Sequence, residues 1–272
     1  MVKKLLAVGC SYTADIYPFP VWPQLLAEKF NMECINLGRC GSGNEYIYSR
    51  TLDTLVTEKN LGLVVVMWSE FQRLDFCTPA GAHTDQKDGK WKTLNYQKRD
   101  EIELIQPPGP ITRAHQQERN YQFWVNKRLV TLTEDGYDDI VYQTEKSIRL
   151  FYSLQQIMKL SEYNNIPFYQ LVGSNPCFHK QLEKVAKTTI DSPYLDKINE
   201  SLFLGWPMLK YIGGWTIDTW LDKVDSGKIG KDSDVRISDE DCHPNKKGHE
   251  KITEMLYNEI KKGVPNGSIQ TT

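Results

Sequence analysis

Short apolar runs alternate with amphipathic stretches along the chain. Four runs rich in branched residues and bounded by turn residues predict buried β-strands, at Lys4–Val8, Glu33–Leu37, Leu61–Met67 and Ile166–Leu171. Apolar residues recur with helical spacing at Trp22–Phe30, Glu45–Glu58, about 138–163 and Pro244–Lys262. Because strands and helices alternate, we expect an α/β fold, a three-layer α/β/α sandwich with a mainly parallel central sheet.

Residues at the start of two helices suggest how those helices are capped. Ser42 and Glu45 have the spacing of a capping box, in which each side chain accepts a hydrogen bond from the other's backbone amide. Pro244 suits the first position of the last helix, because its missing amide proton costs nothing there.

Two long stretches, about 74–120 and about 173–235, lack this periodicity. Loops of that length usually bind something or cover a site. We therefore expect one domain over residues 1–272 with two insertions, both located at the carboxyl ends of the strands. Aromatic residues in them could stack on a sugar or could equally form insertion cores: Trp91, Tyr96, Trp206 and Trp215.

Composition narrows the functional class. The 272 residues carry 33 basic and 35 acidic side chains, and this near-neutral balance argues against binding to nucleic acid through bulk charge. No apolar run reaches the roughly 18–20 residues of a membrane span, and the four apolar residues after Lys4 are too few for a secretory signal. We expect a cytoplasmic protein whose six cysteines are reduced thiols.

Two distant motifs contain residues suited to nucleophilic chemistry. Ser11 follows the first strand directly, at the sheet edge where open α/β folds bind ligands. His243 lies within four residues of three acids, Asp239, Glu240 and Asp241, just before the last helix. A carboxylate that orients an imidazole allows the imidazole to deprotonate a serine. The alternative is a polar strand end together with an acidic helix N-terminus, which the helix dipole favours.

These motifs resemble those of the SGNH (GDSL-like) hydrolases. Gly9-Cys10-Ser11-Tyr12-Thr13 matches the first block of that family with Cys10 in place of Asp, Asn36 to Asn44 resembles the second, and Asp241-Cys242-His243-Pro244-Asn245 resembles the last. The Gly-Cys-Ser-Tyr-Thr variant is similar to that of bacteriophage and bacterial members. The resemblance implies a flavodoxin-like SGNH hydrolase fold.

The resemblance also implies roles for individual residues. Ser11 would be the nucleophile and His243 the base, with Asp241 as the acid and Glu240 as second choice. The amides of Ser11 and Gly41 would form the oxyanion hole. Ser69 stands where the family usually has Asn, and its single hydroxyl would be the third donor.

Other nearby residues are weaker candidates. Arg73, Asn44 and Trp68 are expected at the substrate pocket, although Arg73 could equally be an ordinary surface arginine. Cys10, Cys40 and Cys242 each neighbour one motif, and we interpret them as small buried hydrophobes rather than metal ligands. His249 is interpreted as a packed helix histidine. We expect neither a metal ion nor another cofactor.

The leading hypothesis is a serine esterase that acts on a small-molecule or glycan ester, for example as a carbohydrate O-deacetylase. The alternative is a catalytically weak or inactive SGNH-like protein that serves as a binding module or a virion component, because Ser69 replaces the usual Asn and Trp68 is bulky. The expected partners are the ester substrate and a virion or a second copy of the chain, with neither nucleic acid nor a membrane.

Overall fold

Four parallel strands form the central sheet of the computed structural model, which describes residues 2–77, 91–95, 140–177, 181–225, 233–238 and 241–263. The strands are β1 (Lys4–Gly9), β2 (Glu33–Asn36), β3 (Leu61–Trp68) and β6 (Phe168–Val172), in the spatial order β2-β1-β3-β6. The four strands expected from the sequence are therefore confirmed, and β1 lies in the interior of the sheet.

Side chains alternate between the two faces of this sheet, as they must in an extended chain. Leu6 and Val8 of β1 belong to one core cluster, whereas Leu5 and Ala7 belong to the other. All eight residues of β3 are buried, because both faces of this inner strand are covered.

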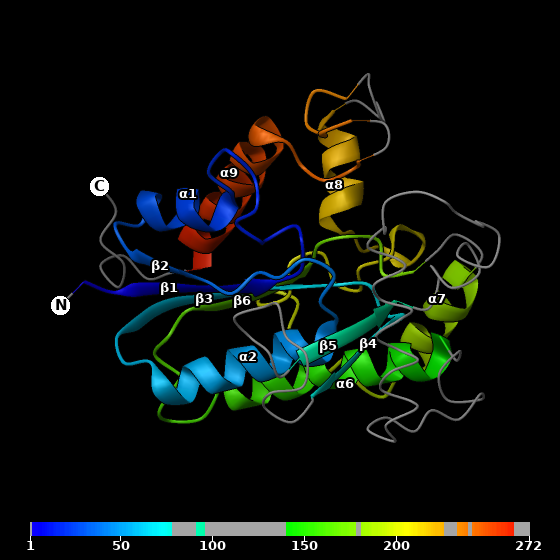
Figure 1. Cartoon of the computed structure of the whole chain (residues 1–272). Helices are drawn as coiled ribbons and strands as arrows, with labels where there is room; N and C mark the ends of the chain where they lie inside the picture. Colours follow the sequence, from blue (N-terminus) through cyan, green and yellow to red (C-terminus); the bar gives the residue numbers. More distant parts are fainter. Residues whose placement is uncertain are drawn as a thin grey trace.

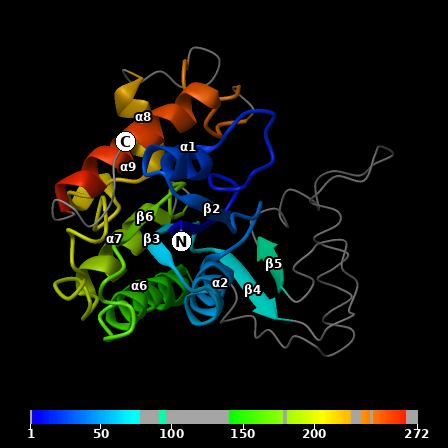
Figure 2. The ribbon, with the colours of Figure 1, turned by 90° about the vertical axis from the view of Figure 1, so that its left-hand side faces the viewer.

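Helices cover both faces (Figures 1 and 2). The helices α1 (Trp22–Lys29) and α9 (Lys246–Gly263) lie on one face, and α2 (Asn44–Thr57) and α6 (Ile140–Ile157) lie on the other. The architecture is thus the expected α/β/α sandwich. Within the described ranges, no helix is both long enough and apolar enough to cross a membrane.

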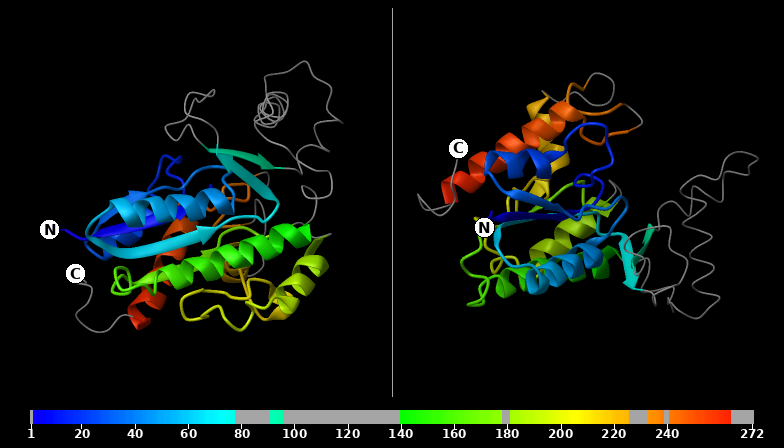
Figure 3. Two further views of the ribbon diagram at one scale, coloured as in Figure 1. Left: turned by 90° about the horizontal axis from the view of Figure 1, so that it is seen from below. Right: turned by 60° about the vertical axis from the view of Figure 1, so that its left-hand side comes forward.

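The two insertions contain regular structure that the sequence pattern did not predict. In the first, β4 (Arg73–Cys77) and β5 (Trp91–Asn95) form an antiparallel pair that lies beside α2 (Figure 3). The second contains α7 (Leu182–Asp191), a 3-10 turn η2 (Lys210–Ile212) and α8 (Ile217–Val224). Residues 96–139, which include Tyr96, lie outside the described residues.

The second insertion is only partly at the carboxyl ends of the strands. Helix α8 begins there, because the amide of Asp218 donates to the carbonyl of Gly173 just after β6 (3.0 Å). Leu202 and Leu204, in contrast, exchange backbone hydrogen bonds with Gln170 in the middle of β6 (2.7 Å each). This part of the insertion supplies hydrogen-bond partners to the edge strand β6. The expectation that all of 173–235 lies at the carboxyl ends of the strands is therefore wrong for this part.

The expected capping box at the start of α2 is absent. The hydroxyl of Ser42 donates to the carbonyls of Gly9 and Arg39 instead. The buried carboxylate of Asp75, from β4, accepts the amides of Gly43 (3.0 Å) and Tyr46 (2.9 Å). A residue 29 positions beyond Tyr46 therefore caps this helix, and the negative charge also suits the helix dipole.

Helix α9 begins later than Pro244. Pro244 forms a β-bridge with Arg236, and Asn245 precedes the helix and accepts the amide of Gly248 through its side-chain oxygen (3.0 Å). The prediction that Pro244 is the first helical residue is wrong, because its segment is held by strand-like pairing. His243 consequently lies three residues before the helix.

Candidate active site

Ser11 lies in a tight turn at the carboxyl end of β1. The amides of Thr13 and Ala14 both donate to the carbonyl of Cys10 (3.0 and 3.1 Å), which reverses the chain around Ser11. Gly38 passes close beneath this turn, and a Cβ there would lie 2.5 Å from the Ala14 nitrogen. Only glycine permits that approach, which brings the loop after β2 against the turn that holds Ser11.

His243 is carried by a short hairpin-like loop. The amide of Ile237 donates to the carbonyl of His243 (2.9 Å), and the amide of Asn245 donates to the carbonyl of Val235 (3.0 Å). Asp241 closes the loop, since its amide donates to the hydroxyl of Ser238 (3.0 Å). This pairing holds Asp241 and His243 in one loop through the loop's own hydrogen bonds.

The fold brings Ser11 and His243 into contact across 232 positions of sequence. The hydroxyl oxygen of Ser11 lies 2.7 Å from Nε2 of His243. Nδ1 of the same ring lies 2.5 Å from Oδ1 of Asp241, which also accepts the His243 amide (3.1 Å). Asp241 is the carboxylate that meets this imidazole among the described residues; Glu240 lies outside them.

This arrangement has the geometry of a nucleophile, a base and an orienting acid. With the proton on Nδ1 directed at Asp241, Nε2 is free to accept the Ser11 hydroxyl proton. Ser11 is 7% exposed, whereas the side chains of His243 and Asp241 are 33% and 45% exposed. The partly open imidazole leaves its ring accessible to solvent beside the buried Ser11 hydroxyl.

Two backbone amides, those of Ser11 and Gly41, are available as hydrogen-bond donors. Within the described part of the chain, neither the Ser11 nor the Gly41 amide has an acceptor. Gly41 adopts a φ of 75°, which favours glycine. Its loop is fastened to the end of β1, because the amide of Arg39 and the hydroxyl of Ser42 both donate to the Gly9 carbonyl (3.0 and 3.2 Å).

Ser69 and Arg73 interact with each other at the end of β3. Nη1 of Arg73 donates to the Ser69 hydroxyl oxygen (2.8 Å) and to the Ser42 carbonyl (3.1 Å), and Glu70 pairs with the same guanidinium (3.0 Å). Ser69 is fully buried and the Arg73 side chain is 10% exposed. Arg73 is therefore not an ordinary surface arginine. Accepting from Arg73 leaves the Ser69 hydroxyl proton as its remaining donor.

Two other candidates for the substrate pocket, Asn44 and Trp68, are buried. Asn44 is buried, and its side chain bonds the backbone amide of Ser69 (2.8 Å) and the hydroxyl of Ser147 (3.1 Å). Trp68 is fully buried, with its indole nitrogen bonded to Gln170 (2.8 Å). The pocket role expected for Asn44 and Trp68 is corrected on this ground: both hold strand ends inside the core.

The described aromatic residues of the insertions differ in their burial. Trp206 is 6% exposed and donates to the Leu195 carbonyl (3.1 Å), so it belongs to the core of its insertion and cannot stack on a sugar. Trp215 is half-buried and packs against the core cluster that contains Leu5. The side chain of Trp91 lies outside the described residues.

The cysteines near the motifs are free thiols. Cys10 is fully buried, as expected, whereas Cys40 is half-buried and Cys242 is exposed, which corrects the expectation for these two. Over the described ranges, no group of three or more His, Cys, Asp or Glu side chains is placed to share a metal ion.

His249 is a packed helix histidine, as the sequence suggested. It is fully buried in α9, and its Nδ1 accepts the amide of Trp22 (3.3 Å). Burial, with a smaller contribution from His243, lowers the pKa of His249 to about 4. The imidazole is therefore neutral in the folded protein at neutral pH.

This lowered pKa predicts a pH-dependent loss of stability. Between about pH 6.5 and 4, the unfolded chain binds a proton at His249 that the folded chain does not. The contribution of the neutral His249 to the free energy of unfolding is fully present above pH 6.5 and is lost as the pH falls towards 4. His249→Gln, which keeps an acceptor for Trp22, should reduce that loss by up to about 3 kcal/mol. Urea unfolding at pH 7 and 4.5 measures it, and equal losses in both proteins would contradict the prediction.

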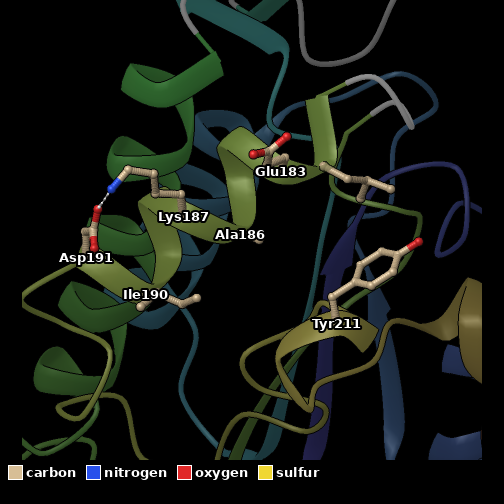
Figure 4. Close-up of a pocket in the computed structure, with 7 residues that line it drawn as sticks. Glu183, Ala186, Lys187, Ile190, Asp191 and Tyr211 are labelled. Atoms are coloured by element: carbon tan, nitrogen blue, oxygen red, sulfur yellow. Dashed lines mark hydrogen bonds and ion pairs between the residues drawn. The ribbon is translucent and has the colours of Figure 1, made fainter.

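A sizeable cavity lies elsewhere on the molecule. It has a volume of about 580 Å³ and is lined by α7 and by Tyr211 (Figure 4). Ala186 and Ile190 contribute its apolar wall, and none of its lining residues belongs to the Ser11–His243 site. The chemistry described above therefore does not depend on this cavity.

Sequence reasoning missed a buried polar cluster beside the site. Arg236 bonds Asp218 (2.8 Å), Asp222 (2.7 Å) and the hydroxyl of Tyr12 (3.3 Å). Tyr12 follows Ser11 directly, but Asp218 lies in the stretch without periodicity and Arg236 just after it, where no pattern marks them. Only the position of Tyr12 within the first motif could have drawn attention to this cluster.

Comparisons with known proteins give low similarities. No protein-family model matches the sequence, and no curated protein matches it. Among solved structures, a protein described as a lipolytic member of the G-D-S-L family from Desulfitobacterium hafniense is 15% identical over 94% of this chain and 99% of its own, with a TM-score of 0.44.

Two further structures match at the same level. A protein from Lactobacillus plantarum is 13% identical, with 97% of this chain and 99% of its own covered and a TM-score of 0.44. LAE5, an alpha/beta hydrolase enzyme from the metagenome of Lake Arreo, is 12% identical over 95% of each chain, with a TM-score of 0.41. At these values, the function has to be inferred from the residues of this chain.

Proposed function

We propose that this protein is a serine hydrolase of carboxylic esters. The observation that carries the proposal is the Ser11–His243–Asp241 geometry, with distances of 2.7 and 2.5 Å along the series. Each of the three has the side chain that one role requires, and the two loops that hold them are fixed by separate backbone hydrogen bonds. A coincidental contact would not place a carboxylate behind the imidazole as well.

The reaction proceeds in two halves. The Ser11 oxygen attacks the ester carbonyl while Nε2 of His243 takes the hydroxyl proton. The tetrahedral intermediate then expels the alcohol, which receives that proton from His243, and an acyl ester remains on Ser11. A water molecule repeats the steps and releases the carboxylic acid. Asp241 keeps the imidazole in the Nδ1–H tautomer and stabilises its charged form.

The amides of Ser11 and Gly41 are the donors that we assign to the developing oxyanion. Both lack an acceptor within the described residues, and the loop of Gly41 is bonded to the end of β1. Such donors contribute most where they are fixed in advance. The Ser69 hydroxyl, polarised by Arg73, is the third donor.

Within this class, a carbohydrate O-deacetylase that releases acetate is the narrower proposal. The resemblance of the three motifs to SGNH hydrolases supports it, and among the described aromatic residues of the insertions named above, Trp215 is half-buried and could contact a sugar. A panel of acetylated oligosaccharides and p-nitrophenyl esters of increasing chain length would decide between acetyl and longer acyl groups.

Hydrolysis of p-nitrophenyl acetate and labelling by a fluorophosphonate test the proposal directly. We expect turnover, together with a covalent adduct that peptide mass spectrometry locates on Ser11. Absence of both would reject the hydrolase and favour the alternative of a binding or virion-associated protein. An adduct on a different serine would move the site.

The choice of acid predicts unequal effects of two neighbouring substitutions. Asp241→Asn should lower kcat by about 10²- to 10⁴-fold, because the amide cannot hold the productive tautomer. Glu240→Gln is the matched control and should change kcat less than threefold. Steady-state kinetics on p-nitrophenyl acetate measures both. If Glu240→Gln loses activity and Asp241→Asn does not, the acid is Glu240.

A further inference from the structure

Tyr12, Asp218 and Arg236 form a buried cluster at the carboxyl end of the sheet. They come from the turn after β1, the first turn of α8 and the loop before His243. Tyr12 is 5% exposed, and the side chains of Arg236 and Asp218 are 4% and 15% exposed. We call these three residues the Tyr12 cluster.

The Tyr12 cluster bonds one backbone carbonyl of the loop that carries Asp241 and His243. Nη1 of Arg236 donates to the Cys242 carbonyl (2.8 Å), and the Tyr12 hydroxyl lies 3.5 Å from the same oxygen. Cys242 stands between Asp241 and His243, so holding its carbonyl limits the movement of the backbone that carries both side chains. Rotation of this peptide would shift the His243 backbone and so disturb the contact between His243 and Ser11.

The charges of the cluster keep Arg236, the donor to the Cys242 carbonyl, in place, and the Tyr12 hydroxyl accepts from the same Nη1 (3.3 Å). Burial alone would disfavour the charge of Arg236, but Asp218 raises the pKa of Arg236 above its ordinary value. Burial and then Asp218 raise the pKa of Tyr12 well above 10, so the phenol stays protonated and donates to Asp218. Asp218 is itself held by the Asn175 amide (3.0 Å), which ties the cluster to the end of β6.

Tyr12 also contacts the imidazole directly. Its ring centroid lies 5.1 Å from that of His243, at an angle of 48°. Tyr12 therefore lies in the turn that holds Ser11 and contacts the His243 ring. Its hydroxyl also bonds Arg236, which donates to the Cys242 carbonyl.

A purely structural explanation accounts poorly for this arrangement. Removing two or three charges from water is costly, and a buried ion pair often contributes no more stability than apolar residues of similar volume. Here the Arg236–Asp218 pair holds the Cys242 carbonyl, next to His243. A misplacement of a catalytic group by about 1 Å can lower the rate roughly 10²-fold.

We propose that Tyr12 and Arg236, held by Asp218, are positioning residues that align Asp241 and His243 with Ser11. The proposal rests on the proposed hydrolase function for its kinetic consequences, but its structural consequence, a fixed His243 ring, can be measured without turnover. Within the described structure, neither side chain forms a hydrogen bond with the Ser11 hydroxyl or with a ring nitrogen of His243.

Tyr12→Phe is the sharpest test, because it removes one hydroxyl and keeps the ring. Tyr169→Phe is the matched control: Tyr169 is also 5% exposed and its hydroxyl donates to a backbone carbonyl, that of Ile260 (3.4 Å), towards the amino end of β6. We expect Tyr12→Phe to lower kcat on p-nitrophenyl acetate about tenfold with less than a twofold change in KM. Tyr169→Phe should leave both constants unchanged.

Arg236→Lys and Arg236→Met extend the test. Lysine restores the charge but not the fork that reaches Asp218, Asp222 and Cys242 together, so we expect a partial loss of kcat in Arg236→Lys and about 10²-fold in Arg236→Met. Thermal unfolding is measured on each. If Arg236→Met does not fold, Tyr12→Phe and Arg236→Lys decide the question.

Long-range ¹H–¹⁵N spectra of histidine-labelled protein supply the readout that needs no activity. We expect the Nδ1–H tautomer of His243 in the wild type and in Tyr169→Phe, and a mixture of tautomers in Tyr12→Phe. Kinetics and tautomer in Tyr12→Phe that match Tyr169→Phe would overturn the proposal. Absence of turnover and of Ser11 labelling in the wild type, with a tautomer change in Tyr12→Phe, would instead reject the hydrolase and retain the positioning role.

Discussion

Ser11→Ala should abolish ester hydrolysis, with kcat/KM reduced by about 10⁴-fold or more. The reaction requires an oxygen nucleophile at this position, and water from solvent would have to replace it without the advantage of being held against the substrate. The remaining activity would come from the amides of Ser11 and Gly41, which alanine leaves in place. The measurement is the initial rate with p-nitrophenyl acetate, together with loss of fluorophosphonate labelling.

The fold should survive this change. The side chain of Ser11 has one hydrogen-bond partner in the described structure, Nε2 of His243, and it packs in a turn that backbone hydrogen bonds maintain. Ser192→Ala is a suitable control, because Ser192 also loses one side-chain hydrogen bond, from the Tyr194 amide, at the end of α7. Hydrolysis that persists in Ser11→Ala would end the hydrolase proposal.

His243→Ala should be nearly as damaging, again by about 10⁴-fold or more. Without the imidazole, the Ser11 hydroxyl keeps its proton and is a poor nucleophile at neutral pH. Labelling of Ser11 by the fluorophosphonate should slow in parallel, because that reaction uses the same activated oxygen. The ratio of the two rate losses is therefore expected to be close to one.

The double variant Ser11→Ala/His243→Ala distinguishes a catalytic unit from two separate effects. If the residues act together, the second substitution costs little once the first is made. If the losses multiplied, the two side chains would contribute independently, and the 2.7 Å contact between them would not be the basis of the activity. Circular dichroism of each variant checks that the fold is retained.

Local sequence patterns were sufficient to predict the strands and helices that form the framework of the fold. The strand β3 is an unbroken apolar run bounded by Asn60 and Ser69, and such a run fits a strand covered on both faces. The helices α1, α2 and α9 lie within two residues of their predicted bounds, because each has an apolar face with helical spacing. Periodicity is a property of neighbouring residues, so a single sequence contains it.

The candidate nucleophile and base could also be chosen from the sequence, because each lies in a short motif at the end of an element. The contact between Ser11 and His243 could not be predicted from the sequence. The sequence places Ser11 after the first strand and His243 before the last helix; the parallel sheet and the loop paired at Arg236 and Pro244 bring the two within 2.7 Å. The choice between Asp241 and Glu240 likewise depends on the turn of that loop.

Tertiary structure alone decided where the buried polar groups find their partners. Asp75 caps α2 from another strand, and Arg236 bonds Asp218 and the Cys242 carbonyl inside the molecule. A buried polar group must be satisfied by whatever donor or acceptor the fold places next to it, and that partner can lie anywhere along the chain. The sequence by itself determined the elements and the candidate nucleophile and base at their ends. The fold decided which distant groups cap, pair and align them, because these pairings depend on proximity in space and leave no periodic trace in the sequence.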